Sequence, residues 1–263
     1  MLPLFLKIAV PLTALYLLLA GYAWLVSDSM LFYPKYAKYP DPASSFKIKT
    51  EDGAAITALS LENDSARYTV LYSYGNACNL GGSLDFMRYL QQQGFSVFGY
   101  DYHGYGTSQG RPSEQSVYRD IDAAYTCLVD SLKVPPGRII AFGRSLGGAV
   151  ACDLASRKPL AGLIMESSFV TAFRVMTRVP LLPFDKFNSI RKIKKVRCPI
   201  LVIHGDSDTT IPAWHGRALF RAAPEPKRLV IIPGGGHNDI PPEAAEAYRR
   251  ALVEFAGSLN QAK

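Results

Sequence analysis

The sequence predicts an α/β fold, with a mainly parallel central sheet covered by helices on both faces, preceded by one N-terminal transmembrane helix. Three observations support this. Apolar, β-rich runs alternate with amphipathic stretches over residues 46–260. A charge-free run, Ile8–Val26, lies near the amino terminus. The chain has 263 residues, of which 48% are hydrophobic, enough for one α/β domain with a large core.

The composition excludes several classes of protein. The four cysteines are widely spaced and form no CxxC pair, so a disulfide scaffold, a zinc ribbon and a thioredoxin-like site are all excluded. The formal net charge of +7 suits an anionic partner, either nucleic acid or a lipid surface. No nucleic-acid recognition motif is present, and we expect no nucleic-acid partner. We expect no metal and no organic cofactor.

The apolar run near the amino terminus has the length of a membrane span. Its 19 residues extend about 28 Å as a helix, close to the hydrocarbon thickness of a bilayer. A cleaved signal peptide is the main alternative and a buried helix a minor one. Signal peptides have shorter apolar regions of about 7–15 residues, and Trp24 lies where a cleavage site requires small residues. We expect residues 1–27 to form a retained single-pass anchor and residues 28–45 a polar connector.

The orientation of this anchor stays open. Lys7 and the terminal amine precede the apolar run, and Lys35 and Lys38 follow it. The positive-inside rule therefore gives no clear bias, and the side of the membrane on which the domain lies is undetermined.

Two periodicities divide residues 46–260 into elements. Short apolar runs rich in β-branched and aromatic residues predict strands at 68–74, 95–100, 138–142, 160–165, 200–204 and 228–232. Apolar residues at helical spacing, such as Val117, Ile121, Ala124 and Leu128, predict helices at 82–93, 113–133, 146–157, 213–223 and 242–259. The one departure is an irregular basic segment between two strands, residues 167–199. In such sheets, function collects at the carboxyl ends of the strands.

A nucleophile motif lies at one strand-to-helix junction. Gly143-Arg-Ser-Leu-Gly147 matches G-x-S-x-G, follows the apolar run Ile139–Phe142 and opens a predicted helix. A serine on so sharp a turn needs glycines two residues to either side, because Cβ atoms there would clash. We predict Ser145 as a nucleophile, with the N–H of Leu146 directed at the developing oxyanion. The alternative is a glycine-rich helix start without chemistry.

A serine hydroxyl needs a base. His103 precedes the serine in the chain, His204 ends an apolar strand as a structural group, and His215 falls in the first turn of a predicted helix. His237 lies in the glycine-rich loop that follows the strand at 228–232. We predict His237 as the base, since mobile bases are found in such loops.

The base needs an orienting acid. Asp208 follows the strand at 200–204 and is preferred over Asp206, which directly follows a turn glycine and can simply cap that turn. Glu166, at the end of another strand, is a third candidate. The chain order serine, aspartate, histidine supports either aspartate.

The second oxyanion donor is expected in the loop after the strand at 68–74. The backbone N–H of Asn76, or of Ala77, would then hold the charge together with that of Leu146. An ordinary polar turn is the alternative.

These motifs together resemble the α/β-hydrolase family. Within it, the chain is similar to the small membrane-anchored branch that includes eukaryotic protein-depalmitoylating hydrolases and their bacterial relatives. The resemblance covers about residues 30–256 and rests on Leu31-Phe-Tyr-Pro34, Gly75-Asn-Ala77, Tyr100-Asp-Tyr-His-Gly-Tyr-Gly-Thr-Ser108, Gly143-Arg-Ser-Leu-Gly147, Glu166-Ser-Ser-Phe169, Cys198-Pro-Ile-Leu-Val-Ile-His-Gly205, Asp208 and His237.

The resemblance adds two assignments and one departure. It implies Asp208 as the acid, from the H-G-x-x-D spacing, and places Asn76 in the oxyanion loop. The branch usually has His-Gly-Asn in this loop, whereas Tyr74 replaces the histidine here. The departure concerns the geometry of the oxyanion loop and leaves the nucleophile unaffected.

The irregular segment concentrates positive charge. Residues 174–197 contain eight lysines or arginines and one acid, beside the apolar stretch Val179–Phe184. We expect residues 167–199 to form a small cap over the strand ends that faces anionic lipid headgroups and admits acyl chains. A solvated, salt-screened face is the alternative.

The expected function is that of a membrane-anchored serine hydrolase. It would cleave an ester or thioester of a lipophilic acyl group, carried by a small molecule, a lipid or a lipidated protein, through an acyl-enzyme intermediate. The alternatives are a catalytically silent anchored scaffold or binding protein and a serine peptidase, because a fold alone does not establish function.

Overall fold

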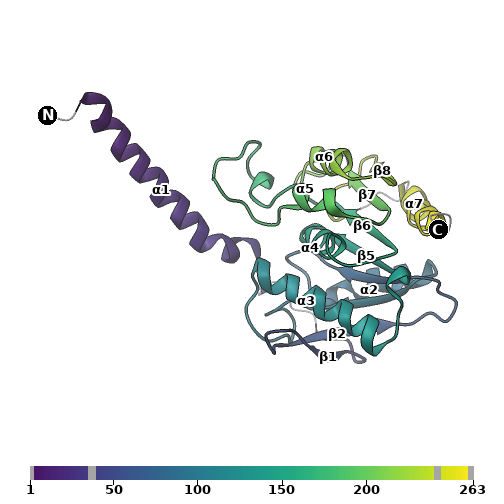
Figure 1. Cartoon of the computed structure of the whole chain (residues 1–263). Helices are drawn as coiled ribbons and strands as arrows, with labels where there is room; N and C mark the ends of the chain where they lie inside the picture. The colour runs from purple at the N-terminus through teal and green to yellow at the C-terminus, as the bar shows by residue number, and fades with distance from the viewer. Residues whose placement is uncertain (1–2, 35–39, 240–243, 260–263) are drawn as a thin grey trace.

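The computed structural model describes residues 3–34, 40–239 and 244–259. One long helix, α1 (Leu4–Leu31), extends away from a layered domain that holds an eight-stranded sheet (Figure 1). This arrangement separates the apolar N-terminal run from the alternating strands and helices, as the sequence predicts.

The sheet is mainly parallel. Its strands are β1 (Phe46–Lys49), β2 (Ala55–Leu61), β3 (Thr69–Ser73), β4 (Ser96–Tyr100), β5 (Ile139–Arg144), β6 (Gly162–Glu166), β7 (Ile200–Gly205) and β8 (Lys227–Ile232). Their order is β1-β2-β4-β3-β5-β6-β7-β8. β1 and β2 pair antiparallel to each other and β2 to β4, whereas the remaining pairs are parallel.

The main helices divide between the two faces of this sheet. They are α2 (Leu80–Gln92), α3 (Glu114–Thr126), α4 (Leu146–Ala155), α5 (Ser189–Lys192), α6 (Trp214–Ala222) and α7 (Ala245–Ser258). Helices α3 to α6 pack in succession on one face. On the other face α2 meets α7, where the rings of Tyr89 and Tyr248 lie 6.4 Å apart. Every residue of α4 is buried, since the sheet and the neighbouring helices α3 and α5 enclose it.

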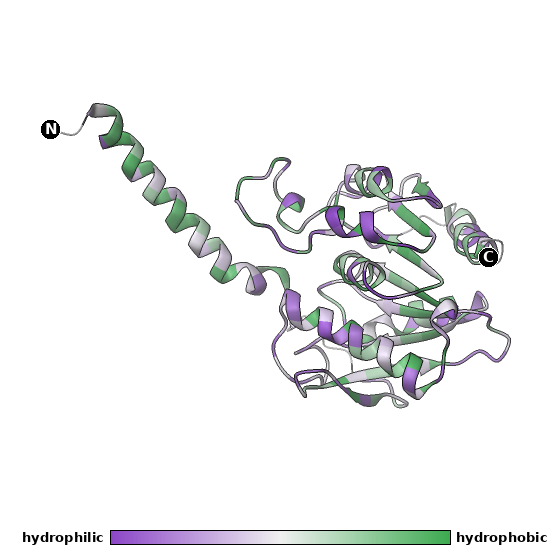
Figure 2. Cartoon of the chain, viewed as in Figure 1, coloured by the Kyte–Doolittle hydropathy of each residue, from purple (hydrophilic) through white to green (hydrophobic). Residues whose placement is uncertain are grey.

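Helix α1 has the length and composition of a membrane span. Within its segment Phe5–Leu31, the most apolar 18-residue window has a mean hydropathy of 1.8, and only 6% of that window is buried against the rest of the protein. Figure 2 shows it as a mostly hydrophobic helix beside a domain in which hydrophobic and hydrophilic residues alternate. The helix continues to Leu31, beyond the boundary expected at residue 27, because its backbone hydrogen bonds run on to the Phe32 N–H, which donates to the Asp28 carbonyl at 3.1 Å.

The segment 167–199, which we call the insert, lies against α1. The Tyr16 hydroxyl donates to the Leu181 carbonyl at 3.1 Å, and the Trp24 and Phe184 rings meet edge to face. Near the domain, the Lys186 ammonium lies 2.6 Å from an Asp28 carboxylate oxygen. These contacts join two parts of the chain separated by more than 150 residues.

The prediction of a mainly parallel α/β sheet is confirmed, with local corrections. Strand β1, at the edge of the sheet, and its neighbour β2 were not anticipated, since polar residues interrupt the apolar pattern of both. The helix expected over 113–133 ends as α3 at Thr126 and continues as a π-helical turn, Cys127–Ser131. The insert is less irregular than predicted, since it contains α5. The expected start of the last helix at residue 242 lies outside the described residues.

Candidate active site

Ser145 occupies a strained turn between β5 and α4. Its backbone adopts φ 54° and ψ −119°, a conformation that side-chain-bearing residues rarely hold. A Cβ added to Gly143 would lie 2.0 Å from the carbonyl oxygen of Gly147, and one added to Gly147 would lie 2.0 Å from that of Ser73. The two glycines therefore allow strand, turn and helix to approach closely enough to present Ser145 at the edge of the sheet.

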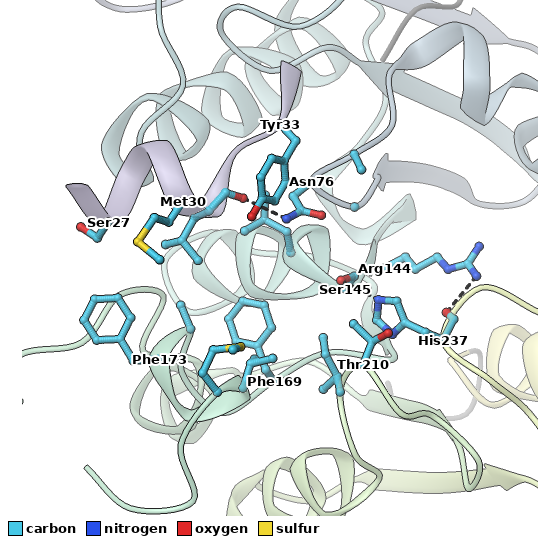
Figure 3. Close-up of a pocket in the computed structure, with 18 of the residues that line it drawn as sticks. Ser27, Met30, Tyr33, Asn76, Arg144, Ser145, Phe169, Phe173, Thr210 and His237 are labelled. Carbon is cyan, nitrogen blue, oxygen red and sulfur yellow. Dashed lines mark hydrogen bonds between the residues drawn. The ribbon is translucent and has the colours of Figure 1, made fainter. Parts of the chain in front are cut away.

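Strand β6 and the residues after it hold this turn in place. The Ser145 N–H donates to the Glu166 carbonyl at 2.8 Å, and the Ser168 hydroxyl donates to the Ser145 carbonyl at 3.0 Å. These bonds fix the backbone of a strained residue, leaving its side chain free to point into the adjoining cavity (Figure 3).

The structure brings together the three residues predicted as a triad. His237 Nε2 lies 3.1 Å from Ser145 Oγ, and His237 Nδ1 lies 2.8 Å from Asp208 Oδ2. The three side chains come from the turns after β5, β7 and β8, which end at the same edge of the sheet. An imidazole between a hydroxyl and a carboxylate can accept the hydroxyl proton on one nitrogen while the carboxylate orients the other.

Asp208 is buried and heavily hydrogen-bonded. One of its oxygens accepts from the N–H groups of Thr210 and Ile211, at 3.0 and 2.7 Å. Burial raises the pKa of this carboxyl, but hydrogen bonds from His204, His237 and the Ile211 N–H outweigh that effect and hold the pKa well below its usual range. The carboxylate therefore stays ionised and suited to orient an imidazolium.

His204 supports this acid, a contact that the sequence did not predict. Its Nε2 lies 2.7 Å from the Ile211 carbonyl and 3.4 Å from Asp208 Oδ2. The prediction of a structural group at the end of β7 holds, but the group it braces is the acid itself. The position of His204 four residues before Asp208 was the available clue.

The other two acid candidates perform different tasks. Asp206 Oδ1 accepts from the N–H of Gly234 at 2.8 Å and so holds the loop that carries His237. Glu166 accepts the Tyr248 hydroxyl at 2.6 Å and faces the Arg144 guanidinium at 3.5 Å. Among the described contacts, neither carboxylate bonds to the imidazole of His237.

Arg144, the residue before the nucleophile, also holds the base. Its Nη2 donates to the backbone carbonyl of His237 at 3.0 Å (Figure 3). The guanidinium is largely buried, and Glu166 is its nearby counter-charge. A charged residue at the end of an otherwise apolar strand was the sequence feature that could have drawn attention to Arg144.

The remaining histidines lie elsewhere. His103 is buried against the carboxylate of Asp120 and has no described contact with Ser145. His215 stacks on Trp214 and accepts from the N–H of Val170 at 3.2 Å. Burial lowers the pKa of His215 to about 4, so this histidine is neutral near pH 7.

The two predicted oxyanion residues border the cavity at Ser145. Leu146 is the first residue of α4, where N–H groups have no partner within the helix. The loop before Asn76 passes beside the serine, since a Cβ on Gly75 would lie 3.4 Å from Ser145 Cβ. The Asn76 side chain donates to the Leu31 carbonyl at 2.9 Å, which ties this loop to the end of α1.

Tyr74, which precedes the oxyanion loop, packs into the core beneath it. Its buried hydroxyl donates to Asp101 Oδ1 at 2.6 Å, and its carbonyl accepts the Tyr102 hydroxyl at 2.7 Å. Burial raises the pKa of Asp101 to about 6. The phenol is thus committed to the core, where it braces the loop that Asn76 borders.

A cavity of about 990 Å³ opens beside Ser145 and His237. Its lining is largely aliphatic and aromatic, and is drawn from the oxyanion loop, the insert and α1. Its volume is at the upper end for small-molecule sites. In the described part of the chain, no group of three or more histidine, cysteine, aspartate or glutamate side chains is arranged to hold a metal ion.

A serine on a strained strand-to-helix turn, facing a histidine at the carboxyl edge of a mainly parallel sheet, is the arrangement of the α/β-hydrolase class of serine hydrolases. A family profile described as "Serine aminopeptidase, S33" matches residues 64–187. The esterase Pf2001 of Pyrococcus furiosus has a similar fold, with a TM-score of 0.69 and 18% identity over 86% of this chain and 95% of the esterase.

Sequence relatives narrow the class to a family. Alpha/beta hydrolase domain-containing protein 17C of Xenopus tropicalis is 39% identical over 220 residues, which cover 82% of this chain and 70% of the relative. The human protein of the same name is 42% identical over 195 residues, 73% of this chain and 58% of its own length. The chain belongs to this family of α/β-hydrolase domain proteins. The predictions of an α/β-hydrolase fold and of a serine-hydrolase type of enzyme are confirmed.

Proposed function

We propose that the chain is a membrane-anchored serine hydrolase that cleaves ester or thioester bonds of lipophilic acyl groups. The observation that carries the proposal is a chain of two hydrogen-bond contacts, from Ser145 to His237 and from His237 to Asp208, at the wall of one large apolar cavity. The alternative of a catalytically silent scaffold would require neither of these two contacts.

In the first half-reaction, Ser145 Oγ attacks the acyl carbonyl carbon while its proton passes to His237 Nε2. The carbonyl electrons move onto oxygen, and the N–H groups of Asn76 and Leu146 stabilise the charge. When the carbonyl re-forms, the C–O or C–S bond breaks. The leaving group takes the proton from His237, and the acyl group stays on Ser145.

In the second half-reaction, water replaces the leaving group. His237 removes a proton from the water as its oxygen attacks the acyl carbon, and it returns this proton to Ser145 Oγ as the ester bond breaks. The free acid departs and the serine is regenerated. Asp208 stays ionised throughout and stabilises the imidazolium in both steps.

The cavity favours acyl esters over peptides with a charged amino terminus. An aminopeptidase must bind a charged amino terminus, which calls for an unengaged carboxylate. The one acidic residue among the described lining residues is Asp185. Its oxygens already accept from the hydroxyl of Thr171 and from the N–H groups of Phe173 and Lys186. The apolar remainder of the lining suits a hydrocarbon chain.

The anchor and the insert suit a lipid surface. Helix α1 would anchor the domain, with residues 28–45 as the connection and residues 167–199 as a cap. Four exposed basic side chains follow the apolar stretch of the insert, and each adds about 1 kcal/mol of attraction near an anionic membrane. These are Arg191, Lys194, Lys195 and Arg197. The full chain should therefore hydrolyse vesicle-borne acyl esters faster in anionic than in zwitterionic vesicles, and equal rates would contradict a lipid-facing insert.

A fluorophosphonate probe tests the proposed chemistry, since it labels activated serines. The full chain in membranes should be labelled, Ser145→Ala should not, and Ser156→Ala should be labelled like the wild type. Ser156 is a suitable control because it ends the same helix and its hydroxyl bonds only locally, to the Asp153 carbonyl. An unlabelled, well-folded wild type that hydrolyses no activated ester would favour the scaffold.

A further inference from the structure

We propose that α1 is part of the substrate site: it forms one wall of an acyl-chain channel that opens sideways into the bilayer between α1 and the insert. The ligand is a long acyl chain that reaches Ser145 without leaving the hydrocarbon of the membrane. This inference rests on the proposed hydrolase function and adds a substrate class and a route of entry.

One face of α1 lines the same cavity as the nucleophile. Leu19, Ala23 and Met30 border it, at spacings of four and seven residues that place them on one side of a helix. Leu25, between the last two, does not border the cavity and is 81% exposed. A helix that served only as an anchor would not need to present one face to Ser145.

The insert supplies the facing wall. Phe173, Met176, Leu181 and Phe184 border the cavity opposite α1, and the Phe173 and Phe184 rings pack edge to face. Met176 and Leu181 are nevertheless 88% and 61% exposed in the isolated protein. Large apolar side chains that are both cavity-lining and exposed mark an apolar mouth that lipid would cover.

The contacts along α1 place this mouth within the hydrocarbon. The Asp28–Lys186 ion pair, the Trp24–Phe184 ring pair and the Tyr16–Leu181 bond follow one another from the domain outward. Twelve residues separate Asp28 from Tyr16, or about 18 Å along a helix, more than half of a hydrocarbon core of about 30 Å. The charged pair and Trp24 then lie at the interface, where such groups are favoured.

Three polar groups of the insert backbone are removed or satisfied at this depth. Unpaired N–H and C=O groups are costly in hydrocarbon. Pro180 and Pro183 carry no N–H, and the Tyr16 hydroxyl satisfies the Leu181 carbonyl. A tyrosine in the middle of an apolar helix thereby has a partner within the protein.

Narrowing the channel from the α1 side tests the wall. The full chain in phosphatidylcholine vesicles is assayed with 4-nitrophenyl hexadecanoate and 4-nitrophenyl acetate. Ala23→Trp should lower the ratio of long-chain to short-chain kcat/KM at least about tenfold, because the indole would fill channel volume that a sixteen-carbon chain needs and a two-carbon chain does not. Leu25→Trp, two residues away on the outer face, should leave the ratio unchanged. An unchanged ratio in Ala23→Trp, or an equal loss on both esters, would overturn the proposal.

A second variant tests the position of the mouth. The extra fluorescence of Leu181→Trp, relative to wild type, should be quenched by lipids brominated on their acyl chains and little affected by a water-soluble quencher. The opposite pattern would place the insert in water and overturn lateral entry. If the wild type hydrolyses neither ester and Ser145 takes no fluorophosphonate, the proposed hydrolase function itself has failed. That result differs from a failure of the channel proposal, in which the wild type is active and only Ala23→Trp or Leu181→Trp gives the contrary result.

Discussion

Replacing Arg144 by methionine should impair the base without touching the triad. The guanidinium donates to the His237 carbonyl at 3.0 Å, and a hydrogen bond from a charged donor contributes about 1.5–3 kcal/mol. If this bond fixes the loop in its working position, kcat should fall about 10- to 150-fold. KM should change little, since the head of Arg144 faces Glu166 and the loop.

The same change leaves Glu166 buried without its counter-charge. Removing one partner of a buried ion pair costs about 3–5 kcal/mol of stability. The Tyr248 hydroxyl, 2.6 Å from Glu166, should keep the loss toward the lower value. A loss of activity in Arg144→Met alone could therefore arise from unfolding.

The double variant Arg144→Met with Glu166→Gln separates the two effects. Glutamine carries no charge to bury and can still accept the Tyr248 hydroxyl, so the melting temperature should recover. The turnover of 4-nitrophenyl acetate should stay low, because nothing replaces the bond to the His237 carbonyl. If stability and kcat recover together, Arg144 does not position the base, and the reasoning is refuted.

Three further changes follow from the geometry. Asp208→Asn should lower kcat by about 10⁴, because the amide disfavours the needed imidazole tautomer, and a loss under tenfold in steady-state assays would contradict the assigned acid. Gly147→Ala should destabilise the domain by at least about 3 kcal/mol or prevent folding, since the new Cβ would meet a strand carbonyl at 2.0 Å. The control Gly137→Ala has open space around it, so its unfolding free energy in denaturant titrations should stay within about 0.5 kcal/mol of the wild type. His215 has a folded pKa of about 4 against 6.5 when unfolded, so the unfolded chain binds more protons between these values and stability should fall by about 3 kcal/mol as pH drops from 6.5 to 4. The difference in unfolding free energy between wild type and His215→Gln should show this slope, and parallel pH curves would contradict it.

The sequence predicted the buried centre of the fold well. Strands β3 to β7 are apolar runs whose burial sets their pattern, and the edge strand β8 keeps the apolar run Leu229–Ile232. The glycines around Ser145 follow from steric necessity. The exposed edge strand β1 and its neighbour β2 were missed because lysine, threonine and serine interrupt their apolar patterns. Helix α1 is longer than its apolar segment because its backbone hydrogen bonds continue to the Phe32 N–H, which an apolar pattern does not reveal.

The site was predicted only as far as local motifs reach. Ser145, His237 and Asp208 each follow a strand, so their convergence could be expected from strand order. The support from Arg144 and His204 depends on contacts across loops, for which the sequence offers only the four-residue spacing of His204 and Asp208. The packing of Tyr16 and Trp24 on the insert joins segments over 150 residues apart, and only the folded chain reveals it.

The central claim is that an acyl group passes through Ser145. The most direct measurement mixes the full chain with a hexadecanoyl thioester, quenches with acid within milliseconds and determines the intact protein mass. We predict a mass increase of one hexadecanoyl group, mapped by peptide analysis to Ser145 and absent from Ser145→Ala. Turnover without such an adduct, or an adduct on the free thiol of Cys78, which also borders the cavity, would contradict the account.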